Sequence, residues 1–212
     1  MKTAWRKGQV VYCVFKRLFD IIISLIGLVF TIPIFIIFAP IIKLHDGGPV
    51  LFKQVRTGKK GREFVLYKFR SMTIDNDVRD FSKEDQMTGV GKFLRKTSLD
   101  ELPQFWNVLK GEMSLVGPRP WIPEYYEEMK LSQRKRYVVR PGITGLAQVK
   151  GRNSIPVSKK IKYDIEYIEK ISFRQDLKII LLTIKAVFTF DGVNHKKSNL
   201  QHEIEELRQS NE

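Results

Sequence analysis

The stretch IIISLIGLVFTIPIFIIFAPII, residues 21–42, contains no charged side chain. A straight helix of this length would extend about 33 Å, enough to cross a hydrocarbon core of about 30 Å. Core helices of soluble proteins are seldom so uniformly apolar. A cleaved signal peptide fits poorly, because the apolar core is too long and no small-residue cleavage site follows it. The stretch therefore predicts a helix in contact with a membrane.

Both flanks of this apolar stretch are basic, so the positive-inside rule places both on the cytoplasmic side. Pro33 lies near the middle and removes one helical hydrogen bond, which predicts a kink. Thr31 is expected to bond one freed carbonyl. From the residues alone two interpretations are open: a single kinked span, and a re-entrant hairpin that enters one leaflet and returns.

The composition favours an anionic partner. Lys and Arg number 37 and Asp and Glu 23, which gives a formal net charge of +14 over 212 residues. Such an excess suits a nucleic acid, a phosphorylated substrate or an acidic lipid. The single cysteine, Cys13, excludes an internal disulfide framework, and the three separated histidines have no metal-ligand spacing. One apolar segment of spanning length argues against a multi-span transporter.

The residues after the apolar stretch predict an α+β domain that is mainly helical and has a small β-hairpin. Residues 50–56 and 62–72 are predicted strands, joined by the glycine-flanked basic turn 57–61. The acid-rich residues 73–90 are expected to form a loop. Helices are predicted near residues 91–95, 99–110, 124–137, 157–170 and 173–190, a short strand at 146–153, and a solvated helix after residue 194. In the last long helix we expect packing on the domain with partial membrane contact, and we expect Trp106 in the core.

The sharpest chemical feature is TSLDELPQFWNVLKGEMSLVGPRP at residues 97–120, where Asp100 and Glu101 are adjacent carboxylates. A structural interpretation is open, because Ser98 and Glu101 have the spacing of a helix capping box. A catalytic interpretation is open as well. Paired carboxylates among fixed cations suit metal-assisted phosphoryl transfer, in which the acids hold Mg²⁺ and one attacks phosphorus.

Basic side chains accompany the two carboxylates along the chain. Arg119 lies between two prolines that fix its backbone, which favours a guanidinium aimed at a phosphate. Residues 130–152 contain seven basic residues and no acid. Taken singly, each basic residue is also explained as a solvated surface charge or a contact with a lipid headgroup.

Several long stretches resemble the bacterial sugar transferases of the monotopic polyprenyl-phosphate phosphoglycosyl transferase family, in particular its small single-domain members. The resemblance covers roughly residues 12–190, in the family's order. The matching stretches are KRLFDIIIS (16–24), YKFRSM (67–72), LRKTSLDELPQFWNVLKGEMSLVGPRP (94–120), RPGITGLAQVKGRN (140–153) and YDIEYIEKISFRQDLKII (163–180). One departure is visible at the membrane kink, where family members often have Ser-Pro and this chain has Ile32-Pro33.

The resemblance implies an enzyme that transfers a phosphosugar from a UDP-sugar to polyprenyl (undecaprenyl) phosphate and releases UMP. The reaction would be the first membrane step of polysaccharide or glycoprotein assembly, at the cytoplasmic face of the bacterial inner membrane. By the same resemblance Asp100 is the nucleophile that carries a covalent phosphosugar, and Glu101 holds Mg²⁺ together with it. The expected substrate-binding residues are Arg95, Pro118, Arg119, Lys59, Arg140 and Arg152.

The resemblance also favours the re-entrant hairpin and divides the chain into four predicted units. These are a basic N-terminal segment (1–17), a re-entrant membrane helix hairpin (18–44), the catalytic domain (45–194) and a polar tail (195–212). Anionic membrane lipid is an expected partner and a homo-oligomer is possible, whereas no nucleic-acid motif occurs. The alternative function is a membrane-anchored basic binding protein without catalysis.

Overall fold

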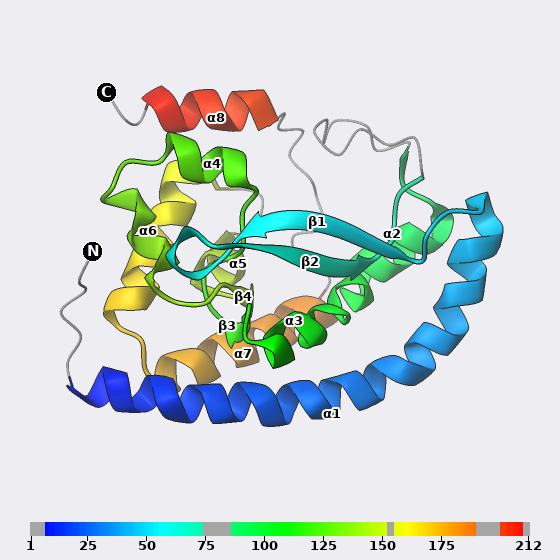
Figure 1. Cartoon of the computed structure of the whole chain (residues 1–212), viewed down its shortest axis with the longest axis horizontal. Helices are drawn as coiled ribbons and strands as arrows, with labels where there is room; N and C mark the ends of the chain where they lie inside the picture. Colours follow the sequence, from blue (N-terminus) through cyan, green and yellow to red (C-terminus); the bar gives the residue numbers. More distant parts are fainter. Residues whose placement is uncertain (1–6, 74–85, 152–154, 190–199, 210–212) are drawn as a thin grey trace.

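The computed structural model describes residues 7–73, 86–151, 155–189 and 200–209. A long N-terminal helix, α1 (Lys7–Asp46), runs along one side of a mixed domain (Figure 1). The strands are β1 (Leu51–Thr57), β2 (Glu63–Phe69), β3 (Ser114–Val116) and β4 (Gly142–Thr144). The α-helices are α2 (Gly89–Lys96), α3 (Gln104–Lys110), α4 (Pro123–Glu128), α5 (Leu146–Gly151), α6 (Val157–Glu169), α7 (Phe173–Phe188) and α8 (Leu200–Gln209), and the 3₁₀ helices are η1 (Lys59–Gly61), η3 (Leu99–Glu101) and η4 (Gln133–Val138). The predicted α+β class is confirmed.

Helix α1 is continuous through Pro33 and Pro40 and curves along the domain in Figure 1. Its most apolar window is only 11% buried, so the helix has the length, composition and exposure of a membrane-associated helix. The kink and the re-entrant hairpin stay predictions. The role predicted for Thr31 is wrong: its hydroxyl donates to the Gly27 carbonyl at 2.7 Å, whereas Pro33 frees the carbonyl of Val29.

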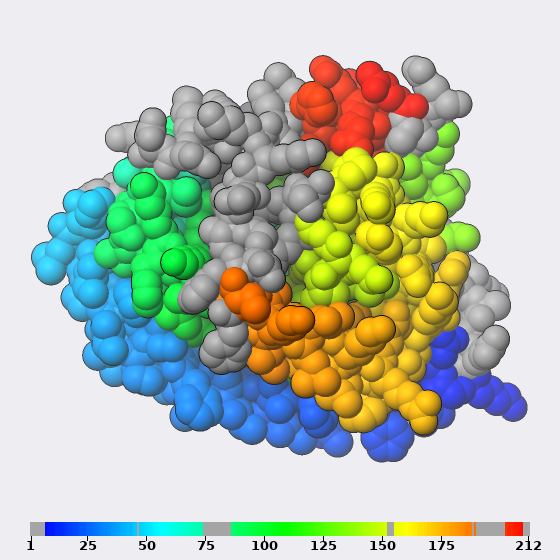
Figure 2. Space-filling model, turned by 180° about the vertical axis from the view of Figure 1, so that it is seen from behind, coloured from blue at the N-terminus to red at the C-terminus, as the bar shows by residue number. Residues whose placement is uncertain are grey.

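The N-terminal half of α1 is bound to the domain through buried polar contacts. The Asp176 carboxylate, at the start of α7, accepts hydrogen bonds from Tyr12 at 2.7 Å, from Lys16 at 2.5 Å and from Tyr167 at 2.8 Å. Asp20 of α1 is also buried and accepts from the Leu115 amide at 3.0 Å. Residues 12–20 are therefore part of the packing of the domain. Seen from behind, α6 and α7 cover the face next to α1 (Figure 2).

The predicted β-hairpin is confirmed as β1 paired antiparallel with β2. Its outer edge is held by α3, because the Asn107 side chain accepts from the Tyr67 amide at 3.2 Å and donates to the Val65 carbonyl at 2.7 Å. Asn107 is fully buried, so it acts in place of a third strand for two backbone groups that would otherwise lack partners. The hairpin and α3 are thereby fixed to each other.

Between residues 114 and 151 the structure differs from the predicted strand at 146–153. A short strand, β4, instead pairs in parallel with β3, and α5 follows it. The pairing needs close backbone contact at two glycines, since a Cβ on Gly142 would lie 2.1 Å from the Gly117 nitrogen. The residues after the turn, Leu146 to Lys150, are mostly good helix formers, which explains α5.

The predicted helix at 124–137 is divided into α4 and η4. The Arg134 guanidinium donates to the carbonyls of Tyr126 and Glu127 at 3.1 Å each, so it satisfies the end of α4 while the chain turns. The predicted helices near 91–95, 157–170 and 173–190 are confirmed as α2, α6 and α7. The expectation that Trp106 is a core residue is wrong, because its side chain is 48% exposed.

The predicted helix in the tail is confirmed as α8, but one of its faces is packed rather than solvated. Leu207 is fully buried in a cluster with Trp121, Tyr125 and Ile161. Glu203 accepts hydrogen bonds from Tyr125 and from Lys160, the latter at 3.3 Å. Most of the predicted loop at 73–90 lies outside the described residues.

The capping-box interpretation of Ser98 and Glu101 is wrong. Ser98 has left-handed backbone angles (φ 59°, ψ 15°), and its side chain makes no cap hydrogen bond. Residues 99–101 form a single 3₁₀ turn, and α3 begins only after Pro103, whose ring fits a helix start but not a helix interior. The two carboxylates therefore do not have the helix-capping role of the structural interpretation.

We expect Asp176→Ala to lower the free energy of unfolding by about 3 kcal/mol, because Lys16 and two tyrosine hydroxyls lose a buried acceptor. The measurement is chemical unfolding of the protein in detergent. Glu166→Ala is the control, since its ion pair with Lys170 is exposed and should contribute less than about 0.5 kcal/mol. Equal effects of the two substitutions would contradict the prediction.

Ser98→Ala is expected to change the free energy of unfolding by less than about 0.5 kcal/mol, whereas loss of a true N-cap costs about 1 kcal/mol. Ser98→Gly should be the more stable of the two variants, because glycine adopts a positive φ without steric strain. Both are measured by the same unfolding experiment. A loss of about 1 kcal/mol in Ser98→Ala would restore the capping interpretation.

Candidate active site

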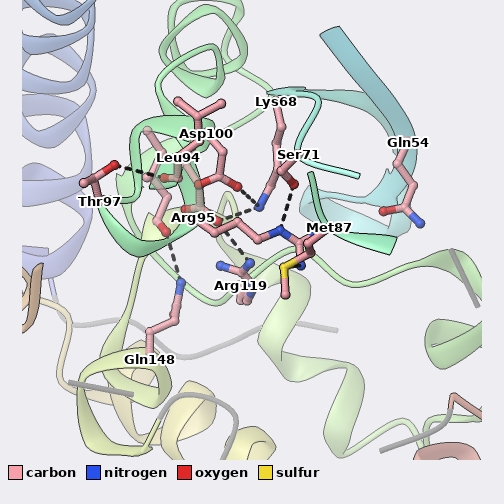
Figure 3. A network of polar contacts seen from close by, with 12 residues as sticks. Gln54, Lys68, Ser71, Met87, Leu94, Arg95, Thr97, Asp100, Arg119 and Gln148 are labelled. Atoms are coloured by element: carbon pink, nitrogen blue, oxygen red, sulfur yellow. Dashed lines mark hydrogen bonds and ion pairs between the residues drawn. The ribbon is translucent and has the colours of Figure 1, made fainter. Parts of the chain in front are cut away.

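The Asp100–Glu101 pair lies where η3 meets β2 and the turn after β3. Asp100 is 7% exposed. The Lys68 Nζ lies 2.6 Å from Glu101 Oε1 and 4.0 Å from Asp100 Oδ2. The Arg119 Nη2 lies 3.1 Å from the same Glu101 oxygen. Figure 3 shows Lys68 pointing toward Asp100, with Arg119 close by. Two carboxylates and two cations from three separate segments thus form one charged cluster.

Lys68 reaches the cluster because of its place on the hairpin. It lies on the same face of β2 as Phe64 and Leu66, because side chains two residues apart in a strand point to the same side. Asn107 fixes the backbone on either side of Leu66. The residue was missed in the sequence analysis. The signal that would have found it is a lysine on the apolar face of a predicted strand, within the quoted YKFRSM stretch.

Arg95 is brought beside the carboxylates by α2. Its Nε donates to Ser71 Oγ at 2.8 Å and its Nη1 contacts Met87 Sδ at 3.7 Å (Figure 3). The close approach of α2 to this segment requires glycine at Gly91, where a Cβ would lie 1.8 Å from the Ser71 carbonyl oxygen. The positive charge of Arg95 acts on Asp100, although the two side chains form no direct ion pair within the described residues.

Arg119 is positioned by its backbone. The Pro118 carbonyl accepts from the Gly142 amide at 3.0 Å, and the Arg119 carbonyl accepts from the Arg136 guanidinium at 2.7 Å. Arg136 is itself completely buried, pairs with Asp164 at 2.7 Å and lies over the Trp121 ring. The Arg119 side chain remains 45% exposed, so a ligand can reach its guanidinium.

The environment separates the two adjacent carboxylates electrostatically. Burial raises the pKa of Glu101, but Lys68 and Arg119 outweigh it and hold the pKa at about 2. For Asp100 burial dominates: together with the charge of Glu101 it raises the pKa above the ordinary value, against the opposing nearby cations. Glu101 is therefore a permanent anion bound to two cations, whereas Asp100 has a more basic carboxylate whose ion pair with Lys68 is long, at 4.0 Å.

A magnesium ion fits the chemistry of this donor set. Mg²⁺ prefers oxygen ligands, keeps several waters and is usually bound by one or two carboxylates together with substrate phosphates. Asp100 and Glu101 supply two carboxylates, and only one oxygen of Glu101 is used by Lys68 and Arg119. No group of three or more His, Cys, Asp or Glu side chains that could hold a metal occurs within the described residues. Two carboxylates suit an ion that is shared with a substrate.

The remaining predicted binding residues are divided among other places. Arg140 donates to the Gly111 carbonyl at 2.7 Å, near the end of α3. The positive charges of Arg140 and Lys60 act on Lys59. Burial, followed by the charge of Arg140, lowers the pKa of Lys59. Arg152 lies outside the described residues. Roles for Lys59, Arg140 and Arg152 in substrate binding stay predictions.

Comparisons with known proteins identify the family of the chain. The family model described as bacterial sugar transferase matches residues 11–190. The sugar transferase EpsL of Bacillus subtilis is 44% identical over 182 residues, covering 85% of this chain and 90% of the relative. The galactosyl transferase CpsE of Streptococcus agalactiae is 46% identical over 193 residues, covering 84% and 43%.

A UDP-glucose:undecaprenyl-phosphate glucose-1-phosphate transferase of Klebsiella pneumoniae is 48% identical over 183 residues, covering 81% of this chain and 39% of the relative. The chain thus spans nearly all of EpsL but less than half the length of the other two. The family model includes every described charged residue of the cluster around Asp100 and Glu101. By the extent of the family match and by these identities, the chain belongs to the bacterial sugar transferase family.

Proposed function

We propose that this protein transfers a phosphosugar from a UDP-sugar to undecaprenyl phosphate and releases UMP. The names of several relatives support the two substrates, among them the Klebsiella enzyme and an undecaprenyl-phosphate galactose phosphotransferase of Salmonella typhimurium. The observation that carries the proposal is the buried Asp100, with a raised pKa, beside a Glu101 that is held between Lys68 and Arg119. The relatives' names specify glucose, galactose and N-acetylgalactosamine, so the proposal stops at the class of UDP-sugar.

The proposed mechanism has two steps at one phosphorus atom. The Asp100 carboxylate attacks the phosphorus that bears the sugar, a bond forms between them, and the bond to the UMP oxygen breaks. A phosphate oxygen of undecaprenyl phosphate then attacks the same phosphorus, and the Asp100 carboxylate is released. Lys68 and Arg119 neutralise the phosphate oxygens in both steps, and Glu101 holds these two cations in place. Mg²⁺ bound by Asp100 and Glu101 would supply further charge neutralisation at the phosphates.

A location on the bacterial inner membrane, with the domain on its cytoplasmic face, is part of the proposal. The support is an exposed apolar surface that extends beyond α1. On α7 the exposed apolar residues Phe173, Leu177, Leu181 and Ile184 follow one stripe, and on α3 Trp106 is exposed. Tryptophan and an apolar helical stripe are both favoured at a membrane interface. A domain bound to the membrane interface in this way would let a soluble donor and a lipid-linked acceptor reach the same site.

The decisive experiment measures UMP release by the detergent-solubilised protein with Mg²⁺, undecaprenyl phosphate and a panel of UDP-sugars. Wild type is expected to release UMP with at least one donor, and Asp100→Asn to lose at least a thousandfold of that rate, because an amide is a poor nucleophile. A labelled phosphosugar should remain on the wild-type protein when the acceptor is omitted. Release by wild type and Asp100→Asn at the same rate would exclude Asp100 as the nucleophile. No release with any donor would favour a membrane-anchored binding protein.

The raised pKa of Asp100 predicts a pH dependence of turnover. As the pH falls through this pKa the nucleophile becomes protonated, so kcat/KM should fall on the acidic side. The positive charge of Lys68 lowers this pKa, and its removal in Lys68→Met should move the acidic limb to higher pH. Lys68→Arg keeps the charge and serves as the control, with its limb near that of wild type. If kcat/KM fell at the same pH in wild type, Lys68→Met and Lys68→Arg, the acidic limb could not be assigned to Asp100.

A further inference from the structure

A second buried-face cation of the β-hairpin, Arg56, is not used by the mechanism above. The register pairs Arg56 with Phe64, Gln54 with Leu66 and Phe52 with Lys68. Directly opposed residues of an antiparallel pair share a face. Arg56 and Gln54 of β1 therefore project to the same side of the hairpin as Lys68 of β2, at positions closer to the turn.

The Arg56 guanidinium is only partly satisfied by the protein. Its Nη2 donates to Gln54 Oε1, and its Nη1 makes a long contact of 3.4 Å with the Pro120 carbonyl. Its Nε is buried and has no hydrogen-bond partner within the part of the chain that the structure describes. Buried N–H groups almost always have a partner, so this one marks a place where a hydrogen-bond acceptor is missing.

The charges near Arg56 indicate that the missing acceptor is an anion. Burial and, after it, the positive charge of Arg119 lower the pKa of Arg56 to about 10. The negative charges of Glu101 and Glu124 act on Arg56 more weakly than Arg119 does, and Oε1 of Glu101 is already shared by Lys68 and Arg119. Arg56 forms no ion pair with any carboxylate of the described residues. Two neighbouring guanidinium groups are thus left with less negative charge than they can bind.

The donor of the proposed reaction carries two phosphates, and this inference rests on that proposed function. The phosphate that bears the sugar must lie at Asp100, next to Lys68. The second phosphate belongs to the nucleotide and gains negative charge as its bond to the first breaks. A guanidinium next to Arg119 is suited to stabilise that charge, because arginine stays protonated and binds phosphate through two N–H groups.

We propose that Arg56 and Arg119 form the subsite for the nucleotide phosphate that leaves as UMP. Gln54 holds the Arg56 guanidinium by accepting from its Nη2. The site takes a nucleoside monophosphate or the matching phosphate of a nucleoside diphosphate sugar. The competing explanation is structural: Arg56 would only tie β1 to the Pro120 carbonyl, and so support the turn that carries Arg119.

The test is direct binding of UMP and of uridine to the full-length protein in detergent, measured by calorimetry. Four proteins are compared: wild type, Arg56→Gln, Arg56→Lys and Arg62→Gln. Arg62 is an exposed arginine of the same hairpin and is the matched control. Arg56→Gln should weaken UMP binding at least tenfold and uridine binding less than twofold, because uridine lacks the phosphate. Arg56→Lys should recover part of the loss, and Arg62→Gln should bind as wild type.

Equal losses for UMP and uridine in Arg56→Gln would support the structural explanation and overturn the subsite. Unchanged UMP binding in Arg56→Gln would overturn it as well, as would a wild type that does not bind UMP. Thermal unfolding of each variant shows whether the fold is kept, and the comparison of two ligands in one variant remains valid if stability falls. In turnover, Arg56→Gln should raise KM for the UDP-sugar at least tenfold and leave KM for undecaprenyl phosphate within twofold.

The binding experiment separates this inference from the proposed function because it needs no turnover. Loss of UMP affinity in Arg56→Gln, combined with no UMP release by wild type, would keep the subsite and reject the transfer reaction. UMP release by wild type, with unchanged UMP affinity in Arg56→Gln, would keep the reaction and reject the subsite.

Discussion

One oxygen of Glu101 accepts both Lys68 and Arg119, and this shared ion pair joins three segments that are distant in sequence. Charges withdrawn from water are costly unless they are paired, so β2, η3 and the turn after β3 have to meet for the fold to hold them. The pairing also determines how basic the Asp100 carboxylate is. Both cations are directed at Glu101, so Asp100 keeps a more basic carboxylate, 4.0 Å from Lys68, which suits the nucleophile of the proposed reaction.

The segments of this ion pair are themselves held by buried polar side chains. Asn107 fixes β2, and Arg136, bound to Asp164, fixes the backbone of Arg119. Each of these groups is almost fully buried, and each replaces water by a specific partner. The site is therefore supported by buried polar contacts, which suits a reaction that depends on electrostatic preorganisation.

Local patterns in the sequence predicted the membrane helix, the hairpin and the two long C-terminal helices, because length, alternation and turn residues determine them. Local sequence patterns gave wrong predictions where tertiary contacts determine the conformation of a side chain. The spacing of Ser98 and Glu101 fitted a capping box, but the ion pair of Glu101 draws its side chain away from the helix start. The residue pair Asp100–Glu101 could be named from sequence, and Arg95 and Arg119 were placed near it, whereas Lys68 depended on strand register and Arg56 on an unsatisfied N–H that no pattern reveals.

The same helix that carries the exposed apolar surface is bonded to the domain at its other end. Tyr12 and Lys16 of α1 meet Asp176, and Asp20 meets the strand β3 that leads to Arg119. No flexible linker separates this end of α1 from the site, so in the proposed reaction the depth of α1 in the membrane would set the height of Asp100 above it. A lipid-linked phosphate has little freedom along the membrane normal. A helix α1 bonded directly to the domain would hold Asp100 at the depth of that phosphate without a conformational step. In the proposed reaction the contacts of residues 12–20 with the domain would therefore affect catalysis as well as stability.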